Sequence, residues 1–408
     1  MKKSLIALAA LGTVASAAHA QSSVTLYGLI DAGVTYINSS KTSTGQGHSL
    51  IAAQDGATAG LSGSRWGMKG TEDLGGGNRA IFVLESGFSY NTGASGQGGD
   101  FFGRQAFVGL SSDNYGTATL GRQYDTGVDL IQPLAAYGTW GNLTAHAGDI
   151  DNIGNLNRVN NVIKYVSPIF SGFKVTGMYS LGGVAGDASR NGLMSFGAQY
   201  ANGPAIVAAN YLFAKNPNYG FFAMNPNASA GTSSTTLGNN FGGSHLAYSK
   251  FSSAGSEQII DAAGNYAIGP ATIGIVYSNI KFFNLGANAD ASNTNPFHNG
   301  DSATFNDVEV NAKYFVTPAV LLGASWNYTK GQQIATTKGV ETGATYNQFN
   351  LGVDYLLSKR TDVYLLGVYQ HASGIDSTGT KAVASITGET QSTTPNQIAI
   401  TTGIRTRF

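Results

Sequence analysis

Hydrophobic and polar residues alternate along much of this chain in runs of about ten residues, a pattern that predicts β-strands. The alternation is clearest in segments 305–316, 319–329 and 346–357. Their apolar faces carry, segment by segment, Val308, Val310, Ala312, Tyr314 and Val316; Val320, Leu322, Ala324, Trp326 and Tyr328; and Asn347, Phe349, Leu351, Val353, Tyr355 and Leu357. Successive side chains of a strand point to opposite sides, so each predicted strand has one apolar and one polar face. Segment 362–371 is apolar on both faces, and alternation does not assign its outer side.

Two kinds of connection separate the predicted strands. Seven are short and predict tight turns: 72–78, 111–116, 167–172, 201–204, 267–270, 316–319 and 357–361. Eight are long and rich in Gly, Ser, Asn and Thr: 38–61, 92–100, 125–157, 182–190, 216–255, 284–304, 331–344 and 374–394. Seven turns interleaved with eight loops predict sixteen strands, with both termini on the turn side. Short turns at one end and long loops at the other are typical of outer-membrane barrels.

A β-sandwich would also alternate, but three features favour a transmembrane β-barrel. The polar faces carry charges such as Asp307, Glu309 and Lys313, as the wall of a water-filled lumen would. Aromatic residues lie near the predicted strand ends, where interfacial girdles form in such barrels: Tyr314, Tyr355, Trp326 and Tyr328. Sixteen strands are too many for one ordinary sandwich, and a closed barrel of that size encloses an aqueous channel. The predicted fold is an all-β, transmembrane, antiparallel 16-stranded barrel.

Composition narrows the class of protein further. Charged residues make up 11% of the chain, well below the roughly 25% of soluble proteins. Gly is abundant at 56 of 408 residues, and cysteine is absent, which excludes a disulfide framework. Length alone would allow two or three domains. The formal net charge is zero, so no nucleic-acid partner is expected.

Residues 1–20 form a separate unit, "MKKSLIALAALGTVASAAHA". Lys2 and Lys3 precede an apolar run, and Ala18 and Ala20 provide an A-x-A cleavage site, which predicts a signal peptide. An N-terminal membrane anchor is the alternative, but the apolar run is too short to span a bilayer. The predicted mature domain is 21–408.

The loop 125–157 is the first candidate functional feature, because connections of this length are functional or disordered. It contains the acids Asp125, Asp129, Asp149 and Asp151 among apolar spacers such as Trp140. We expect this third long loop to fold into the barrel and narrow the pore. An ordinary exposed loop is the alternative.

Basic residues on the barrel wall are the second candidate feature. Alternation places four of them inside: Arg65, Lys69, Arg158 and Lys164. Alternation does not fix the direction of two others nearby: Arg104 and Arg122. Bases on the wall opposite loop acids would create a transverse field across a narrow aperture, and rings of charge set ion selectivity in pores. The alternative is that these bases are buried partners of Asp31, Glu85 or Glu309 and only pin the loop.

No catalytic arrangement is expected. The histidines His48, His146, His245 and His298 lie in predicted loops, and none has the H-x-x-x-H spacing of a metal site. No G-x-S-x-G occurs, and the short glycine patterns lie between strands rather than before a helix. The sequence therefore predicts no enzyme activity, no cofactor and no metal.

Several stretches together resemble the general porins of β-proteobacteria, of the Neisseria and Burkholderia type. They are "SSVTLYGLIDAGV", "SRWGMKGTEDLGGGNRAIFVLESGF", "FFGRQAFVGLSSDNYGTATLGRQYD", "RVNNVIKYVSPIFSGF", "YNQFNLGVDYLLSKRTDVY" and the terminal "GIRTRF". The matches run from Ser22 to Phe408 and are collectively specific.

This resemblance implies a homotrimer of sixteen-stranded barrels in the outer membrane, each with its own pore. It implies passive diffusion of small hydrophilic solutes and ions, and contact with outer-membrane lipid and lipopolysaccharide. The third long loop would correspond to about 125–157, opposite wall arginines in the matching motifs: Arg65, Arg104 and Arg158. The middle of the loop, "PLAAYGTWGNLTAHAGDI", matches least, so the resemblance does not identify the acids of the constriction.

The sequence thus predicts a diffusion porin with a mild preference for anions, because inward bases outweigh the loop acids. A substrate-specific outer-membrane channel is the main alternative. An autotransporter-type barrel would need a passenger domain, which we do not expect here, and an outer-membrane hydrolase would need a nucleophile–His pair.

The chain ends in an alternating strand that finishes on Phe408. We expect "IAITTGIRTRF" to pair with "VTLYGLIDAGV", since an unpaired strand would leave an exposed sheet edge. Arg405 and Arg407 would then face water. The resemblance also implies that Phe408 belongs to the signal read by the outer-membrane assembly machinery.

Overall fold

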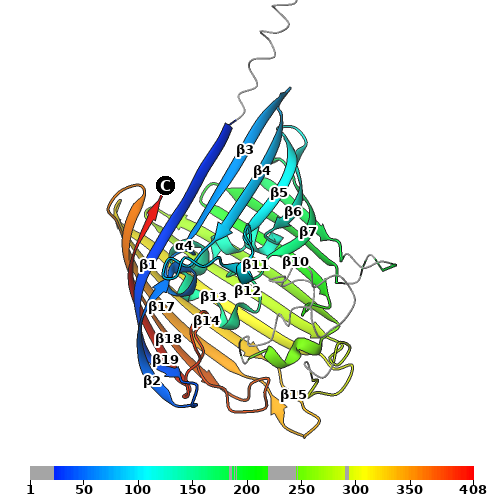
Figure 1. Cartoon of the computed structure of the whole chain (residues 1–408), viewed down its shortest axis with the longest axis vertical. Helices are drawn as coiled ribbons and strands as arrows, with labels where there is room; N and C mark the ends of the chain where they lie inside the picture. The colour runs from blue at the N-terminus through cyan, green and yellow to red at the C-terminus, as the bar shows by residue number, and fades with distance from the viewer. Residues whose placement is uncertain are drawn as a thin grey trace, which may run out of the picture.

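The computed structural model describes residues 23–408 except 183–185, 188, 190, 219–244, 246 and 290–293. The predicted signal peptide lies outside the described residues, and so does most of loop 216–255. Strands tilted around a common axis form a closed barrel, and short helices lie among them (Figure 1). Within the described part of the chain, no helix has the length and apolarity needed to cross a membrane.

Seventeen strands form one sheet. They are β1 Ser23–Lys41, β2 Gly47–Asp55, β3 Arg65–Gly75, β4 Asn78–Gly87, β5 Gln105–Ser112, β6 Gly116–Gln123, β7 Val159–Val166, β8 Phe173–Ser180, β9 Leu193–Asn202, β10 Ala205–Lys215, β11 Ser256–Ile268, β12 Ala271–Phe283, β13 Ala303–Thr317, β14 Val320–Gly331, β17 Thr345–Leu356, β18 Thr361–Ser373 and β19 Asn396–Arg407. β2 and β3 pair with successive stretches of β1 and share one position, so the barrel has sixteen positions, as predicted.

The pairing of β1 with β19 closes the barrel, in an antiparallel register from Leu29 opposite Arg407 to Ile37 opposite Ala399. Closure matters because a backbone N–H or C=O left unpaired in hydrocarbon costs several kcal/mol. Phe408 extends this seam: its N–H donates to the Gly28 carbonyl, and its carbonyl accepts from the Gly28 N–H. The predicted pairing of the last strand with the first is confirmed.

All seven predicted tight turns connect neighbouring strands. One long loop was predicted with the wrong extent. Within 38–61, β1 continues to Lys41 and β2 occupies Gly47–Asp55, followed by the short helix α2 (Gly56–Ala59). Most of β2 is exposed on both faces, so its sequence lacks the alternation that identifies the other strands. Loop 331–344 also contains a small hairpin, β15 (Ile334–Ala335) with β16 (Glu341–Thr342).

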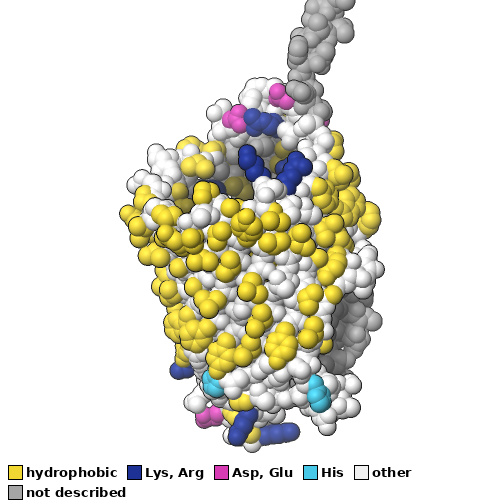
Figure 2. Space-filling model, turned by 90° about the vertical axis from the view of Figure 1, so that its left-hand side faces the viewer, with side chains coloured by type: hydrophobic (Ala, Val, Ile, Leu, Met, Phe, Trp, Pro, Cys, Tyr) yellow, Lys and Arg dark blue, Asp and Glu magenta, His cyan; other side chains and the backbone are white. Residues whose placement is uncertain are grey.

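The alternation assigns the two faces of the clearest strands correctly. In β13, Val310 and Tyr314 are exposed, whereas Asp307 and Glu309 are buried. Figure 2 shows the side on which β1, β17, β18 and β19 lie in Figure 1; hydrophobic side chains cover its middle, and charged side chains gather at its ends. The outer surface is thus apolar where a bilayer would surround it.

β18 was the ambiguous strand, and the structure resolves it. Leu365 and Tyr369 are exposed on the outside, whereas Leu366 and Val368 are buried inside. The inner face is apolar because buried loop residues cover it: Leu366 clusters with Trp140, and Val368 with Leu143. Because the inward and outward faces of β18 are both apolar here, the hydrophobic pattern could not distinguish them.

Arg405 and Arg407 lie on the opposite face of β19 from its exposed isoleucines. The Arg405 Nε donates to Asp362 Oδ1 at 3.1 Å, and the Arg407 Nη1 donates to Asp362 Oδ2 at 2.8 Å. The buried Asp362 of β18 therefore holds both arginines beside the closing seam.

Candidate functional site

The segment between β6 and β7 folds into a chain of short helices. They are α3 Thr126–Leu130, η3 Gln132–Leu134, α4 Ala136–Trp140, η4 Asn142–Thr144 and η5 Ala147–Asp149. Asp125 caps the first of them, because its Oδ1 accepts from the N–H groups of Gly127 and Val128. From Asp125 to Asn155, nearly every residue is half-buried or buried. We call residues 125–157 the inner loop.

Side chains from the buried faces of three strands hold the inner loop by its backbone. Glu309 of β13 accepts from the Ala136 N–H at 2.8 Å. Asn327 of β14 donates to the Thr144 carbonyl at 2.7 Å. Gln348 of β17 donates to the carbonyls of Leu143 and Ala145. The loop backbone thus finds partners on the wall, as a buried loop must.

Glycines of β9, β14 and β17 make room for the loop's large side chains. A Cβ atom on Gly323 would lie 2.3 Å from the Trp140 ring, and one on Gly352 would lie 2.8 Å from it. A Cβ atom on Gly197 would lie 2.5 Å from Leu130. Glycine inside a strand often marks such a close approach. These glycines let the inner loop pack directly on the sheet.

On its other side the inner loop faces a cavity of about 200 Å³. Three arginines line this cavity together with Tyr137 of the loop: Arg65, Arg104 and Arg158. Arg65 begins β3, and Arg104 and Arg158 immediately precede β5 and β7. These three strands run in the same direction at every second position of the sheet, so their first residues lie at similar heights, each roughly 10 Å from the next. We call this set the arginine cavity.

Glu85 of β4 is the counter-ion of the arginine cavity. Its Oε1 accepts from Arg104 Nε at 2.7 Å and from the Tyr124 hydroxyl at 2.9 Å. Its Oε2 accepts from the Tyr27 hydroxyl at 3.0 Å and lies 4.0 Å from Arg65 Nε. A hydrogen-bonded ion pair offsets the cost of burying Arg104. The alternative of a buried partner therefore holds for Arg104 and Glu85.

Arg158 is held differently. Its Nη1 donates to the Leu156 carbonyl at 2.9 Å, and its guanidinium lies 5.9 Å from the centre of the Tyr124 ring. Its buried Nε has no hydrogen-bond partner, and no carboxylate of the described residues lies within ion-pair distance. A backbone carbonyl and an aromatic ring leave its positive charge uncompensated.

The four loop acids do not line the arginine cavity. Asp125 caps α3, Asp149 accepts from the N–H groups of Gly154 and Leu156, and Asp151 pairs with His146. Asp129 forms an ion pair with Lys164. The loop acids stabilise the loop and its attachment to the wall.

Burial changes the pKa of several loop groups. It raises the pKa of Asp125 to about 6, against hydrogen bonds from Val128 and Asn152 that favour the carboxylate. Burial, followed by the nearby Asp151, raises the pKa of Asp149 to about 8. Burial and the charge of Asp149 raise the pKa of Tyr137 to about 12, so its hydroxyl stays neutral beside the arginines at neutral pH.

The remaining predicted bases lie outside the arginine cavity. Lys69 is exposed, with its Nζ 5.5 Å from the centre of the Tyr27 ring. Arg122 donates to the Gly103 carbonyl and to Asn160. Lys164 donates to the Tyr124 carbonyl in addition to pairing with Asp129.

Sequence reasoning missed the aromatic and small members of the site. Tyr27, Tyr124 and Tyr137 gave no signal, because tyrosine is also the ordinary residue of an interfacial girdle. The only signal for Gly323 and Gly352 was the presence of a glycine inside a strand of larger residues.

Comparison with known proteins assigns this chain to a protein family. Residues 7–374 match the Gram-negative porin family. An outer membrane porin of Bordetella pertussis is 32% identical over 390 residues, which cover 90% of this chain and 94% of that protein. The major outer membrane protein P.IB of Neisseria gonorrhoeae is 34% identical over 216 residues, covering 49% of this chain and 56% of that protein.

Solved structures share the fold. The anion-selective porin from Comamonas acidovorans superposes with a TM-score of 0.69 at 21% identity, covering 95% of this chain and all of that one. OmpT of Vibrio cholerae in its trimer form gives a TM-score of 0.59 at 18% identity, covering 95% and 99%. The match over most of the sequence, together with the closed apolar-sided barrel, shows that this protein belongs to the Gram-negative porin family and forms an outer-membrane porin channel.

Proposed function

We propose that this porin lets small hydrophilic solutes and ions diffuse passively through a water-filled pore, with a mild preference for anions. The observation that carries this is the arginine cavity beside the inner loop. Three guanidinium groups line it, and the described carboxylate in contact with them is Glu85. The constriction of the pore is this cavity, with the inner loop as one wall.

Electrostatics gives the sign of the preference. Glu85 offsets one of the three positive charges, so the cavity carries a positive excess. Low-dielectric walls focus such a field and raise the local concentration of counter-ions. The loop acids do not cancel it, because Asp129 is paired with Lys164 and burial raises the pKa of Asp149, which favours its neutral form. The anion selectivity of the structurally similar Comamonas porin supports the same sign.

The working unit we propose is a homotrimer embedded in outer-membrane lipid and lipopolysaccharide. Proteins of similar structure include an outer membrane protein of Vibrio cholerae in trimer form. No catalytic step is part of this function.

The test is a planar bilayer with the purified trimer under a tenfold KCl gradient. We expect a reversal potential that indicates chloride preference. A cation-selective reversal potential would overturn the anion preference, and a closed or saturable channel blocked by one solute would favour the substrate-specific alternative.

Phe408 is proposed as part of the assembly signal. Its ring packs on Gly28, where an added Cβ would lie 2.4 Å from the ring, and half of its surface stays exposed. Deletion of Phe408 should lower the yield of trimer in the outer membrane severalfold while the assembled fraction conducts normally. Quantitative immunoblotting of outer membranes measures this, with Leu357→Ala as an exposed apolar control; equal yields would contradict the proposal.

A further inference from the structure

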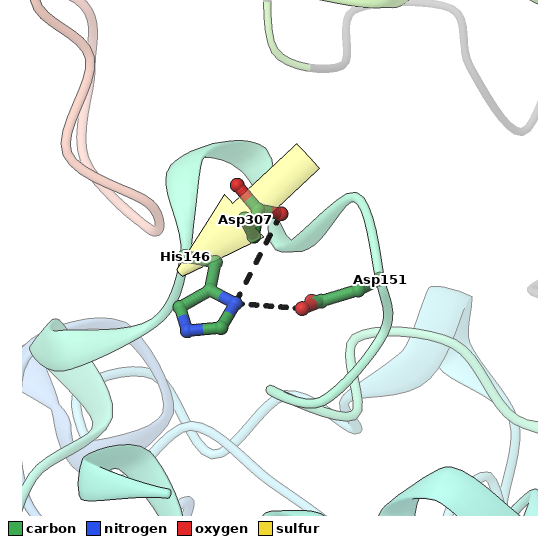
Figure 3. A group of neighbouring side chains, drawn as sticks. All are labelled: His146, Asp151 and Asp307. Carbon is green, nitrogen blue, oxygen red and sulfur yellow. Dashed lines mark hydrogen bonds and ion pairs between the residues drawn. The ribbon is translucent and has the colours of Figure 1, made fainter. Parts of the chain in front are cut away.

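Behind the inner loop, on the side away from the arginine cavity, lies a buried cluster of one histidine and several acids. His146 and Asp151 come from the loop, and Asp307 and Glu309 come from β13. All four are buried, and Asp151, Asp307 and His146 each offer a ligand atom within 4.8 Å of the others. Figure 3 shows the carboxylates of Asp151 and Asp307 on the same side of the imidazole ring.

The two nitrogens of His146 face different partners. Its Nδ1 lies 2.6 Å from Asp151 Oδ2 and 4.0 Å from Asp307 Oδ2. Its Nε2 lies 3.4 Å from Glu309 Oε2. A histidine that binds a metal through one nitrogen usually directs the other N–H to a carboxylate, which fixes its tautomer and orientation. Glu309 stands where that carboxylate is needed.

Asp307 is the observation that points to a ligand. Its side chain is 1% exposed, and neither carboxylate oxygen meets the geometry of a hydrogen bond with a described residue. One of these oxygens is aimed at the space beside His146 Nδ1 (Figure 3). The Thr329 side chain and the 4.0 Å approach of His146 Nδ1 only partly compensate this buried carboxylate, and metal coordination would offset the rest of the cost of burying it.

The local charge balance also calls for a cation. Among the described residues, His146 is the only basic side chain within ion-pair distance of Asp151, Asp307 or Glu309. One imidazolium against three carboxylates leaves a negative excess in a buried place. A divalent ion would offset it without moving the wall.

We propose that His146, Asp151 and Asp307 bind one divalent transition-metal ion of the zinc class, which joins the inner loop to the barrel wall. Ligands 2.0–2.2 Å from zinc lie roughly 3.4 Å apart in a tetrahedral site. The observed separations of 2.6 Å and 4.0 Å bracket that value, so a small side-chain shift closes the site. One imidazole and two carboxylates suit zinc better than calcium or magnesium, which prefer oxygen ligands alone.

Binding would replace the proton on His146 Nδ1 with the metal, and Ser278 would keep Asp151 in place. The hydroxyl of Ser278, which lies on β12, donates to Asp151 Oδ2 at 2.9 Å. Loop and wall would then be linked by coordination bonds rather than by one ion pair. The metal would have a structural role, separate from conduction.

The test uses trimer extracted from the outer membrane in detergent, stripped with EDTA, then incubated with ZnCl2 and dialysed. Elemental analysis should find one zinc per protomer. Asp307→Asn and His146→Gln should weaken zinc binding at least tenfold in titration calorimetry, and His48→Gln, at an exposed histidine of β2, should leave it unchanged. Zinc should also raise the temperature at which wild-type trimer unfolds.

Two results would overturn the proposal. One is zinc uptake by wild type no greater than that of Asp307→Asn, which would leave protonated His146 as the bridge between the acids. The other result is obtained with wild type and so does not depend on whether the variants assemble. Cobalt added to wild type should give the visible absorption of a histidine–carboxylate site, and the absence of this absorption would also reject the site. Either result leaves the channel proposal standing, since conduction does not require the metal.

Discussion

The two sides of the inner loop are built from different chemistry. Toward β3, β5 and β7 it faces arginines across a cavity, beside the ion pair of Asp129 with Lys164 of β7. Toward β13, β14 and β17 it touches the wall directly, through Asn327, Gln348 and the glycines beneath Trp140. One side anchors the loop, and the other leaves room for water and ions.

The two sides of the loop require different kinds of residue. Direct packing needs small wall residues and amides that satisfy the loop backbone, because an unpaired buried peptide group costs roughly 1–3 kcal/mol. An aperture that selects ions needs charges that are only partly compensated. Arg158, with no described carboxylate within ion-pair distance, would be a poor anchor but suits the aperture.

A large side chain in place of a glycine beneath Trp140 should have the largest effect on the stability of the anchored side. We call Gly323 and Gly352, on which the Trp140 ring packs, the glycine sockets. Gly323→Leu would place its side chain where the Trp140 ring lies, so the ring must leave its site. Losing a buried tryptophan contact costs about 3–5 kcal/mol. We expect a markedly lower unfolding temperature of the trimer and noisy or altered single-channel conductance.

The matched control is Gly367→Leu on the outer face of the neighbouring wall. A Cβ atom there meets nothing within 4 Å. If Gly323→Leu and Gly367→Leu behaved alike, the glycine sockets would have no role in holding the loop.

Reversing a charge should affect the open side instead. Arg158→Glu replaces an arginine that has no described carboxylate partner with a negative charge, and the hydrogen bond to the Leu156 carbonyl is lost with the guanidinium. It should shift the chloride-to-potassium permeability ratio toward cations about fivefold, the factor that corresponds to about 1 kcal/mol. Reversal potentials measure this. The lost hydrogen bond, worth roughly 0.5–1.5 kcal/mol, should lower the unfolding temperature less than Gly323→Leu does.

Arg360→Glu is the control for Arg158→Glu, because Arg360 is exposed in the turn before β18. Equal shifts in both variants would mean that net charge, rather than the cavity, sets selectivity.

Salt should produce the smallest effect. The Debye length is about 10 Å at 0.1 M and about 3 Å at 1 M ionic strength. Because the Arg65 side chain is 27% exposed, salt can screen part of the field of the arginine cavity, and the wild-type chloride preference should fall gradually between these concentrations at a constant gradient ratio. The stability of the anchored side should hardly change over the same range, since its contacts are buried amides and apolar groups.

The alternation of the sequence predicted the direction of some side chains and not of others. The alternation placed Asp307 and Glu309 inside and Val310 and Tyr314 outside without any knowledge of tertiary contacts. It also placed Arg65 and Arg158 on the inner wall, but it could not decide Arg104, which precedes its strand and is held by Glu85. β2 escaped detection because it is exposed on both faces.

The acids of the loop show what could not be predicted. Asp125, Asp149 and Asp151 looked like a row of charges across the aperture, yet each is used by nearby backbone or by His146. A carboxylate in a loop can cap a helix, bind a metal or face a channel, and sequence spacing does not distinguish these roles.

The sequence by itself determined the class of fold, the number of strands, their two faces and the seven turns. Those features follow from a local period of two and from short connections, which need no long-range information. Tertiary structure alone decided which wall the loop packs on, which arginines share a cavity and which acids meet His146. These contacts join residues far apart in the chain, such as Asn327 with Thr144, and they depend on side-chain shape and closure of the barrel rather than on any local pattern.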